Sequence, residues 1–330
     1  MKNIDTLKFI YYISNDNLQM IKEIENKLSN IIIESNINKT LKNKSKIRSI
    51  YSSLAIENNS LSLKSVENVI DNKIVLGKKK DIQEVKNINK VYEYINKFDY
   101  KSEEDFFIVH SLMMKHFDDD NGYYRDHGEG VKRDDKIIYT APESIVVPSL
   151  MKSLFNFLKE EDNIHPIIKA SLFHYYLVYI HPFSDGNGRM ARFWVYLILI
   201  NWNKKFEYIS IEEEIYLNQE EYYDAISECH NNGNANVFIE FMLKIINNIL
   251  DKTTQKTTQK IKLNNNQLKI IKYIKNNPTI TKKELAKKLN ITEDGVKYNL
   301  SRLTNQNIIK RLGSNRSGYW ETNTIFMEEI

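Results

Sequence analysis

Residues 181–192, which read HPFSDGNGRMAR, gather several side chains that are useful for chemistry on phosphate. His181 supplies an imidazole, the side chain best suited to proton transfer near neutral pH. Asp185 supplies a hard carboxylate oxygen, which can complete a Mg²⁺ shell together with phosphate oxygens. A base and a metal ligand four residues apart indicate a phosphate-bearing substrate.

The second half of this segment is suited to binding an anion. Gly186 and Gly188 flank Asn187 and let the backbone come close to a ligand. An apolar run follows directly, so their N–H groups would lie at a helix N-terminus, where anions bind. Arg189 and Arg192 are three residues apart and project from one face of the first turn. With His181 and Asp185, these groups describe a nucleoside triphosphate site.

Two apolar runs, residues 167–180 and 193–200, must hold this loop between them, and each predicts a buried helix. Pro182 biases the preceding residue away from the α region, so the first helix should end with His181 at its tip. Phe183 would anchor the loop in the core. A Gly-Asn-Gly turn alone would more often be only a helix cap, so the functional interpretation depends on the whole string.

The whole string resembles the signature of the Fic family, His-Pro-Phe-x-Asp/Glu-Gly-Asn-Gly-Arg-x-x-Arg, at every defined position. Proteins of that family move AMP from ATP to a hydroxyl group of a target protein. The resemblance implies that His181 is the base, that Asp185 holds Mg²⁺, and that residues 186–188 bind the α- and β-phosphates. It also implies that Arg189 and Arg192 neutralise the β- and γ-phosphates.

The motif ends in Gly-Arg, whereas family members that act as protein kinases carry Lys-Arg there. This difference favours transfer of a nucleotide over transfer of a phosphate. We therefore expect ATP as the substrate, Mg²⁺ as the cofactor, and a Ser, Thr or Tyr hydroxyl as the acceptor.

A second motif, Ser53-Leu-Ala-Ile-Glu57-Asn58, resembles the inhibitory motif of the family, Ser/Thr-x-x-x-Glu-Gly/Asn. Ser53 and Glu57 are four residues apart and so share one face of the helix expected over about residues 41–58. The resemblance implies that Glu57 pairs with Arg192 and keeps the γ-phosphate from binding productively.

Residues 130–139 predict a β-hairpin, because two alternating segments flank the polar residues 133–135. In the family a flap at this position pairs with the backbone of the target. The expected flap residues are Gly130, Val131, Lys132, Ile137, Ile138 and Tyr139. A hairpin without function is the alternative.

Tyr222 and Tyr223 belong to a segment that resembles the Asn-x-x-x-Tyr-Tyr of similar proteins, where it borders the adenosine pocket. Paired tyrosines on an amphipathic helix are, however, often only packing residues. Among the histidines, His110 and His174 lie in apolar runs and are expected to pack in the core.

The composition favours an all-α protein. Of 330 residues, 42% are hydrophobic, and only 10 are Gly and 5 Pro. The single cysteine, Cys229, excludes an intrachain disulfide, and no Cys/His cluster suggests zinc. We find neither a signal-peptide core nor an uncharged apolar stretch of about 18 residues, so we expect a cytoplasmic protein without membrane contact.

Four regions are expected along the chain. Residues 1–95 form helices that include the inhibitory helix, and residues 96–250 form a Fic core that closes with a helix over 237–250. Residues 251–262 contain the repeat Thr-Thr-Gln-Lys and form a polar linker. Residues 263–330 form a winged helix-turn-helix.

The last region predicts DNA binding. Thr281-Lys-Lys-Glu284 is a capping box for its second helix, residues 296–303 predict the third, and residues 308–311 and 319–321 predict a wing. Residues 261–322 hold 13 Lys and Arg against 4 Asp and Glu, whereas the whole chain has a net charge of only +4. The expected DNA contacts are Lys297, Tyr298, Asn299, Arg302 and Arg316. A winged helix used for protein contacts or dimerisation is the alternative.

The sequence thus predicts a protein adenylyltransferase with an all-α Fic core, inhibited by Glu57, with a small hairpin flap and a winged helix-turn-helix. Two rivals stay open: removal of AMP by the same site, and a DNA-binding regulator whose Fic domain senses a nucleotide. The expected partners are a target protein, which can be the chain itself, and DNA; a second copy in a homodimer is a further candidate.

Overall fold

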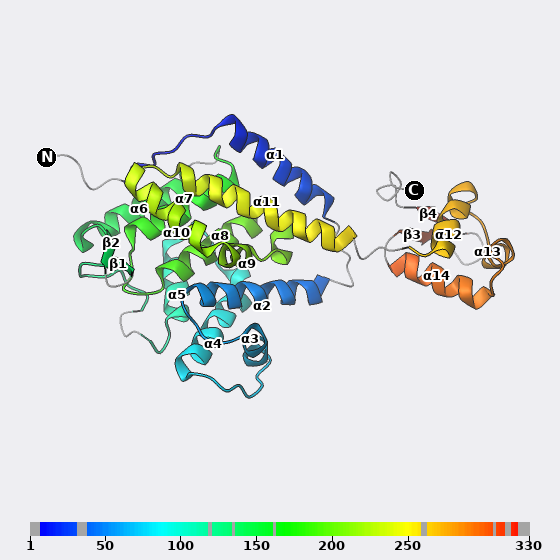
Figure 1. Cartoon of the computed structure of the whole chain (residues 1–330), viewed down its shortest axis with the longest axis horizontal. Coiled ribbons are helices and arrows are strands. Elements are labelled where there is room, and N and C mark those ends of the chain that lie inside the picture. Colours follow the sequence, from blue (N-terminus) through cyan, green and yellow to red (C-terminus); the bar gives the residue numbers. More distant parts are fainter. Residues whose placement is uncertain are drawn as a thin grey trace. The chain divides into compact units, whose positions relative to one another are not determined.

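The computed structural model describes residues 7–31, 38–117, 121–133, 136–160, 163–258, 263–305, 308–313 and 318–322. The chain divides into two compact units, one of residues 1–31 and 38–253 and the other mainly of residues 254–330 (Figure 1). Helices dominate both units, and each described unit also carries a two-stranded antiparallel sheet. The predicted fold class is therefore confirmed.

The N-terminal part of the first unit is helical, as expected. Ser14 caps the first helix, and Ser102 accepts a hydrogen bond from the Asp105 N–H (3.1 Å) at the start of the fifth. The elements are α1 (Asn15–Asn30), α2 (Asn38–Ile56), α3 (Leu63–Ile70), α4 (Lys79–Glu93), the short η1 (Ile95–Lys97) and α5 (Glu103–Met113). The predicted inhibitory segment forms α2 and the turn after it.

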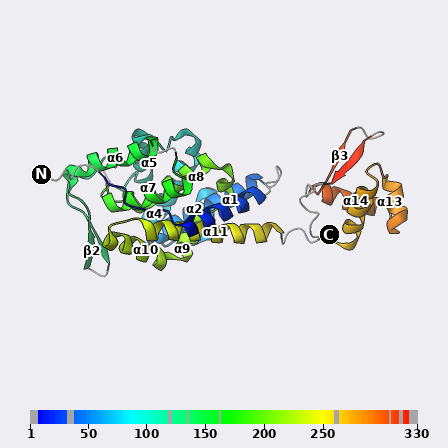
Figure 2. The same cartoon turned by 90° about the horizontal axis from the view of Figure 1, so that it is seen from above.

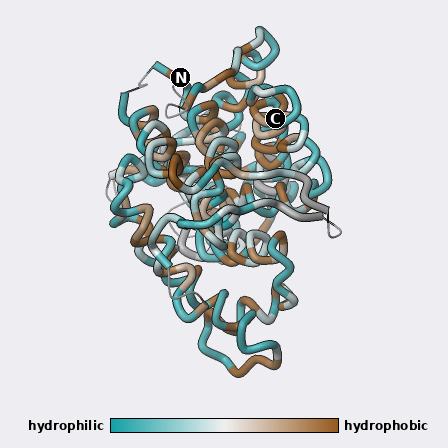
Figure 3. Tube along the Cα trace, turned by 90° about the vertical axis from the view of Figure 1, so that its left-hand side faces the viewer, coloured by the Kyte–Doolittle hydropathy of each residue, from teal (hydrophilic) through white to brown (hydrophobic). Residues whose placement is uncertain are grey.

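Two helices, α7 (Pro166–Ile180) and α8 (Asn187–Trp202), form the centre of the first unit, where other helices surround them (Figures 1 and 2). Nearly every side chain of both helices is buried, which explains why their sequences are apolar on all sides. Trp194 packs against Phe106 and Phe173 in this core. Figure 3 shows hydrophobic stretches along the helices in the interior, and also a hydrophobic outer loop, where Ile74 and Leu76 are exposed.

The remaining helices enclose this centre. They are η2 (Ser144–Val146), α6 (Val147–Glu160), η3 (Lys204–Tyr208), α9 (Ile211–Leu217), α10 (Gln219–Asn232) and α11 (Asn236–Thr258). The helix end predicted at Leu250 is too early, because the Thr-Thr-Gln-Lys repeat contains no Gly or Pro and continues α11 to Thr258. No helix among the described residues combines the length and the apolar character needed to cross a bilayer.

The predicted hairpin is present as β1 (Gly130–Arg133) and β2 (Lys136–Thr140). The strands are antiparallel, Gly130 pairs with Thr140, and the register shifts between Val131 and Lys132. Residues 134–135 of its turn lie outside the described residues.

The second unit consists of α12 (Asn265–Asn276), α13 (Lys282–Leu289), α14 (Glu293–Asn305), β3 (Ile309–Leu312) and β4 (Tyr319–Thr322). Both hydrogen bonds of the predicted capping box at Thr281 and Glu284 are present. α14 begins three residues earlier than expected, because Thr292 Oγ1 accepts from the Gly295 N–H (3.1 Å) and starts the helix there. The buried core of the second unit is mainly aliphatic, and β4 adds Trp320 to it. The aliphatic residues include Ile270, Ile274, Leu285, Val296, Leu300 and Leu303.

Candidate active site

His181 ends α7 in the left-handed conformation, with φ 50° and ψ 61°. Its backbone N–H still donates to the Leu177 carbonyl (2.9 Å), so the residue is fixed to the helix tip as predicted. Gly186, with φ 86°, then turns the chain into α8. A glycine suits this position because other residues rarely adopt such a φ.

The loop between these residues is closed from inside. Phe183 is fully buried and stacks on the ring of His110, with centroids 3.5 Å apart. The Phe183 N–H donates to Asn187 Oδ1 (3.0 Å), and Asn187 Nδ2 donates to the Phe183 carbonyl (2.7 Å). Phe183 is thus the expected anchor. The amide oxygen and the amide nitrogen of the Asn187 side chain are thus both used within the loop.

His110 also positions Asp185. The Gly122 N–H donates to its Nδ1 (2.9 Å), so the proton lies on Nε2, which donates to the Asp185 carbonyl (2.9 Å). We expected only a packing role for this histidine, and the structure adds the hydrogen bond to the loop.

Arg125, for which no role was predicted, connects the loop to the base of the hairpin. Its guanidinium group donates to the carbonyls of His181 (2.7 Å), His127 (2.6 Å) and Pro142 (2.6 Å). Its backbone N–H donates to the Pro182 carbonyl (2.9 Å). The side chain is buried beside the carbonyl end of α7, where a positive charge is favourable.

We expect Arg125→Met to lower the free energy of unfolding by about 1.5–3 kcal/mol, because buried carbonyls lose a charged donor. Any transfer reaction that depends on His181 should fall further than nucleotide binding, because His181 loses the donor that fixes its backbone. Urea unfolding and nucleotide titration measure the two effects. Arg125→Lys is the matched control and should retain part of the stability; equal stability of all three proteins would contradict this role.

The imidazole of His181 is suited to accept a proton. Burial lowers its pKa, which the Val178 carbonyl partly opposes, so the ring is neutral at neutral pH. A neutral ring has a free acceptor nitrogen, as a general base requires.

Arg192 is 2% exposed and contacts Ser53 and Glu57 of the motif that the sequence predicts to be inhibitory. Its Nε donates to Ser53 Oγ (3.0 Å), and an Nη donates to the Ser53 carbonyl (3.0 Å) and to Glu57 Oε1 (2.6 Å). Although burial disfavours its charge, the Glu57 carboxylate raises the pKa of Arg192. The expected ion pair between Glu57 and Arg192 is therefore formed in this structure.

The turn after α2 explains why the motif accepts glycine or asparagine. Asn58 has a φ of 64°, its N–H donates to the Ala55 carbonyl, and the Asn59 N–H donates to the Leu54 carbonyl, both at 3.0 Å. This is a Schellman motif, whose left-handed position favours these two residues. It places Glu57 at the helix end.

Glu57 lies against the first turn of α8. A Cβ atom added at Gly188 would overlap Glu57 Oε1 and would also approach the Arg192 guanidinium. The carboxylate thus uses the space that the missing side chain leaves, next to the backbone that the sequence assigns to phosphates.

Arg189 is also buried and lies between two carboxylates. Its Nη atoms approach Asp185 Oδ1 at 2.8 Å and Glu84 Oε1 at 3.5 Å. Although burial disfavours ionisation of Asp185, Arg189 lowers the pKa of that carboxyl group. The side chain of Asp185 is 53% exposed and can therefore meet a ligand from solvent.

The donors fit Mg²⁺ only together with a substrate. Within the part of the chain that the structure describes, no group of three or more His, Cys, Asp or Glu side chains could hold a metal ion. Asp185 offers one carboxylate, so phosphate oxygens and water must supply the other ligands, as is usual for Mg²⁺ with nucleotides.

The two tyrosines of α10 differ. Tyr222 is buried, and its hydroxyl bonds to His174 Nε2 (2.9 Å), which confirms His174 as a core residue. Tyr223 is 41% exposed, and its hydroxyl donates to the Ile56 carbonyl (3.4 Å) at the end of α2. Tyr223 is thus the one of the two that is available to a ligand.

The hairpin is attached to the core through Tyr139. Its hydroxyl donates to the Tyr179 carbonyl (2.7 Å), and its ring stacks on His230, with centroids 4.0 Å apart. Gly130, Val131, Lys132, Ile137 and Ile138 lie on the two strands. The structure describes only the backbone of residues 131–133 and 136–138.

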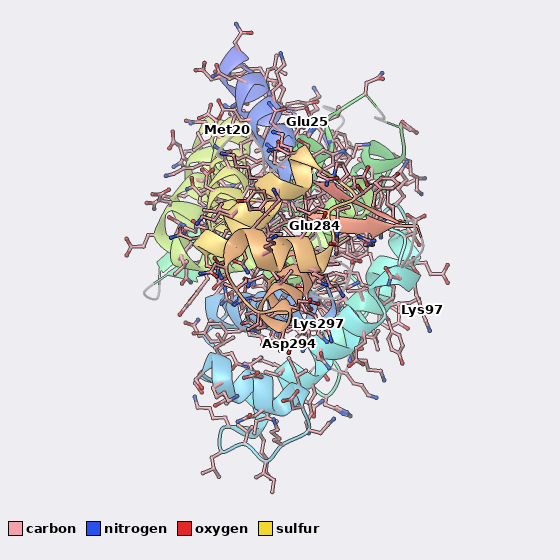
Figure 4. All side chains as sticks on the ribbon, turned by 90° about the vertical axis from the view of Figure 1, so that its right-hand side faces the viewer. Met20, Glu25, Lys97, Glu284, Asp294 and Lys297 are labelled. Carbon is pink, nitrogen blue, oxygen red and sulfur yellow. The ribbon has the colours of Figure 1, made fainter. Side chains whose placement is uncertain are left out.

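In the second unit, α14 presents exposed polar side chains. Lys297, Tyr298 and Arg302 are exposed, and Arg302 donates to the Tyr298 hydroxyl (3.3 Å). Figure 4 shows Lys297 and Asp294 on this helix, and Glu284 on α13. The prediction for Asn299 is wrong, because its side chain is buried and donates to the Gly295 carbonyl (2.7 Å). Arg316 lies outside the described residues.

Comparison with known proteins gives the same two parts. Residues 98–199 match the Fic/DOC family, and residues 263–310 match the winged helix-turn-helix DNA-binding family. Protein adenylyltransferase Fic of Nematostella vectensis is 29% identical over 219 residues, which cover 63% of this chain and 49% of that protein. Protein adenylyltransferase Fic of Aedes aegypti is 25% identical over 262 residues, which cover 74% and 49%. The chain spans about half the length of these two relatives.

A solved structure is similar over nearly the whole chain. The crystal structure of a Fic family protein from Desulfovibrio desulfuricans G20 has 30% sequence identity and a TM-score of 0.73, and the match covers 96% of this chain and 98% of that one. Fold and sequence define a helical Fic/DOC domain, in which a histidine loop lies between two buried helices, and a winged helix-turn-helix. The chain belongs to the Fic family.

Proposed function

We propose that this protein is a protein adenylyltransferase, which moves AMP from ATP to a Ser, Thr or Tyr hydroxyl of a target protein and releases diphosphate. The observation that carries the proposal is the loop itself, in which twelve residues bring together His181, Asp185, Arg189 and Arg192. The names of the relatives from Nematostella vectensis and Aedes aegypti support the same activity.

The proposed step follows from these positions. His181 accepts the proton of the target hydroxyl, and the oxygen of that hydroxyl attacks the α-phosphorus. The bond from this phosphorus to the diphosphate breaks. The N–H groups of residues 186–188 and the two arginines offset the negative charge, which is the main task in such a transfer. Mg²⁺, held by Asp185 and phosphate oxygens, would add positive charge at the diphosphate.

Glu57 is proposed to restrain this activity. Its carboxylate occupies Arg192, the residue proposed for the γ-phosphate, and lies against Gly188. A triphosphate would bring negative charge to the same guanidinium, so the two anions compete.

Labelled ATP tests the activity directly. With the Glu57→Gly chain, label from the α-phosphate should appear on protein and label from the γ-phosphate should not. Label from the γ-phosphate alone would show phosphate transfer, and no label from either, with ATP still bound, would reject the proposal. Release of AMP from a modified protein by the wild-type chain, lost in Glu57→Gly, would show the reverse activity, in which Glu57 aligns a water molecule.

DNA binding is proposed for the second unit, because Lys297, Tyr298 and Arg302 are exposed on α14 in a strongly positive segment. We expect Lys297→Ala and Arg302→Ala to weaken binding to duplex DNA and to reduce the slope of log affinity against log salt by about 1 each. Fluorescence anisotropy at several salt concentrations measures this slope.

Lys269→Ala, an exposed position on α12, is the matched control for this DNA measurement. Full-chain binding without salt dependence, or dimerisation that depends on this unit, would favour the alternative of a protein-contact domain.

A further inference from the structure

We propose that Glu84 is a positioning residue for the reaction: it holds Arg189 when Asp185 turns toward Mg²⁺. The inference rests on the proposed function in one respect, that Asp185 is the metal ligand. Neither the family motif nor the sequence pattern assigns a role to Glu84, which lies on α4, 105 positions from its arginine partner.

Glu84 is buried between two parts of the site. Its Oε1 lies 3.5 Å from an Nη of Arg189, and its Oε2 accepts from Asn59 Nδ2 at 2.7 Å. The side chain is only 9% exposed, compared with 53% for Asp185. Glu84 is therefore held in place, whereas Asp185 is accessible from solvent.

Asp185 has two competing uses. It now accepts from Arg189 (2.8 Å) and from the Gly186 N–H (2.6 Å) through the same oxygen, Oδ1. Binding of Mg²⁺ draws the carboxylate charge to the cation, which weakens its attraction for Arg189. A buried guanidinium without a carboxylate is costly, and Arg189 is 3% exposed. Glu84 is the second described carboxylate within reach, so it keeps Arg189 charged and oriented.

Glu84 also links this pair to the inhibitory turn. Asn59, which donates to Glu84, closes the Schellman motif after Glu57 through its backbone N–H. The amide of the same side chain also donates to the Asp81 carbonyl (3.1 Å). The two arginines of the loop are thus each paired with a carboxylate from the N-terminal region, Arg192 with Glu57 and Arg189 with Glu84.

Glu84→Gln tests the role, because it keeps the shape and an acceptor oxygen and removes the charge. Without metal, ATP should bind about 3–10-fold more tightly, since Arg189 is less neutralised and attracts phosphate. The Mg²⁺ midpoint, which is the Mg²⁺ concentration at half of its effect on ATP binding, should rise about tenfold. The reason is that Asp185 is then the one charged partner left for Arg189 and is less free to bind the metal. Titration of a fluorescent ATP analogue with the full chain, with and without Mg²⁺, measures both.

Glu84→Gln should thus strengthen ATP binding without metal and weaken the response to Mg²⁺. A merely structural role would weaken both, so the two measurements separate positioning from structure. Asn59→Ala removes the other partner of Glu84 without removing charge and should shift the Mg²⁺ midpoint less than Glu84→Gln does. No shift in either quantity for folded Glu84→Gln, or weaker ATP binding in both conditions, would overturn the inference. Both readouts are binding measurements, so they remain decisive even if no AMP is transferred.

Discussion

Replacing His181 with alanine, in the chain that also carries Glu57→Gly, is expected to lower AMP transfer by about 10²–10⁴-fold. Neither of two other histidines of the core can replace this imidazole: His110 is occupied by the Gly122 N–H and the Asp185 carbonyl, and His174 is buried against Tyr222. ATP binding should change by less than about twofold, because the phosphate groups meet Arg189, Arg192 and the backbone of residues 186–188. Quantified α-phosphate label on protein and nucleotide titration measure the two effects.

The pH dependence gives a second arm of the same test. Burial lowers the pKa of His181, and the base acts in its neutral form. Transfer should therefore persist at pH about 6.5, the ordinary pKa of histidine, and fall only at lower pH. His127→Ala removes an exposed histidine near the loop and should leave the rate unchanged. Transfer that survives in His181→Ala would reject His181 as the base.

The parts of this site that could be predicted from sequence are those that depend on neighbouring residues. Pro182 after His181 and the apolar runs on both sides were enough to predict a loop between buried helices. The residue type at position 58 also depends only on the local backbone, because the helix ends there with a left-handed residue, which favours Asn or Gly. The spacing of Ser53 and Glu57 predicted a shared face, and the structure places both on Arg192.

The supporting residues could not be predicted, because their partners are distant in the chain. His110 contacts a carbonyl 75 positions away, Arg125 one 56 positions away, and Glu84 an arginine 105 positions away. These pairs form only when α4, α5 and the segment between α5 and β1, which carries Arg125, pack against the loop. Burial of its charged side chain is what marks Arg125 as a structural residue, and neither composition nor periodicity reveals that burial.

The error at Asn299 has a different origin. It is not the start of the helix, which lies at Glu293 and not at Val296, because an earlier start does not change which residues share a face. The buried side of α14 contains Val296, Leu300 and Leu303, and Asn299 lies with them, three residues from the first and one from the second. An exposed face made of Lys297, Tyr298 and Arg302 agrees with this spacing.

Glu57→Gly should raise AMP transfer by about 10–150-fold, the factor that corresponds to a charge-assisted contact of about 1.5–3 kcal/mol gained between Arg192 and the γ-phosphate. The ion pair is suited to such control, since Arg192 is buried and the Glu57 side chain is 34% exposed. Initial rates with α-labelled ATP measure the effect.

The same substitution should destabilise the protein when no nucleotide is present, because Arg192 loses its carboxylate while it stays buried. ATP should restore thermal stability more in Glu57→Gly than in wild type, since its phosphates then supply the missing charge. Glu57→Gln keeps the size of the side chain and should resemble Glu57→Gly in rate if charge is decisive. Ser53→Ala removes only one neutral acceptor from Arg192 and should have a smaller effect. A rate in Glu57→Gly within about twofold of wild type would mean that the pair does not compete with the γ-phosphate, although it is formed.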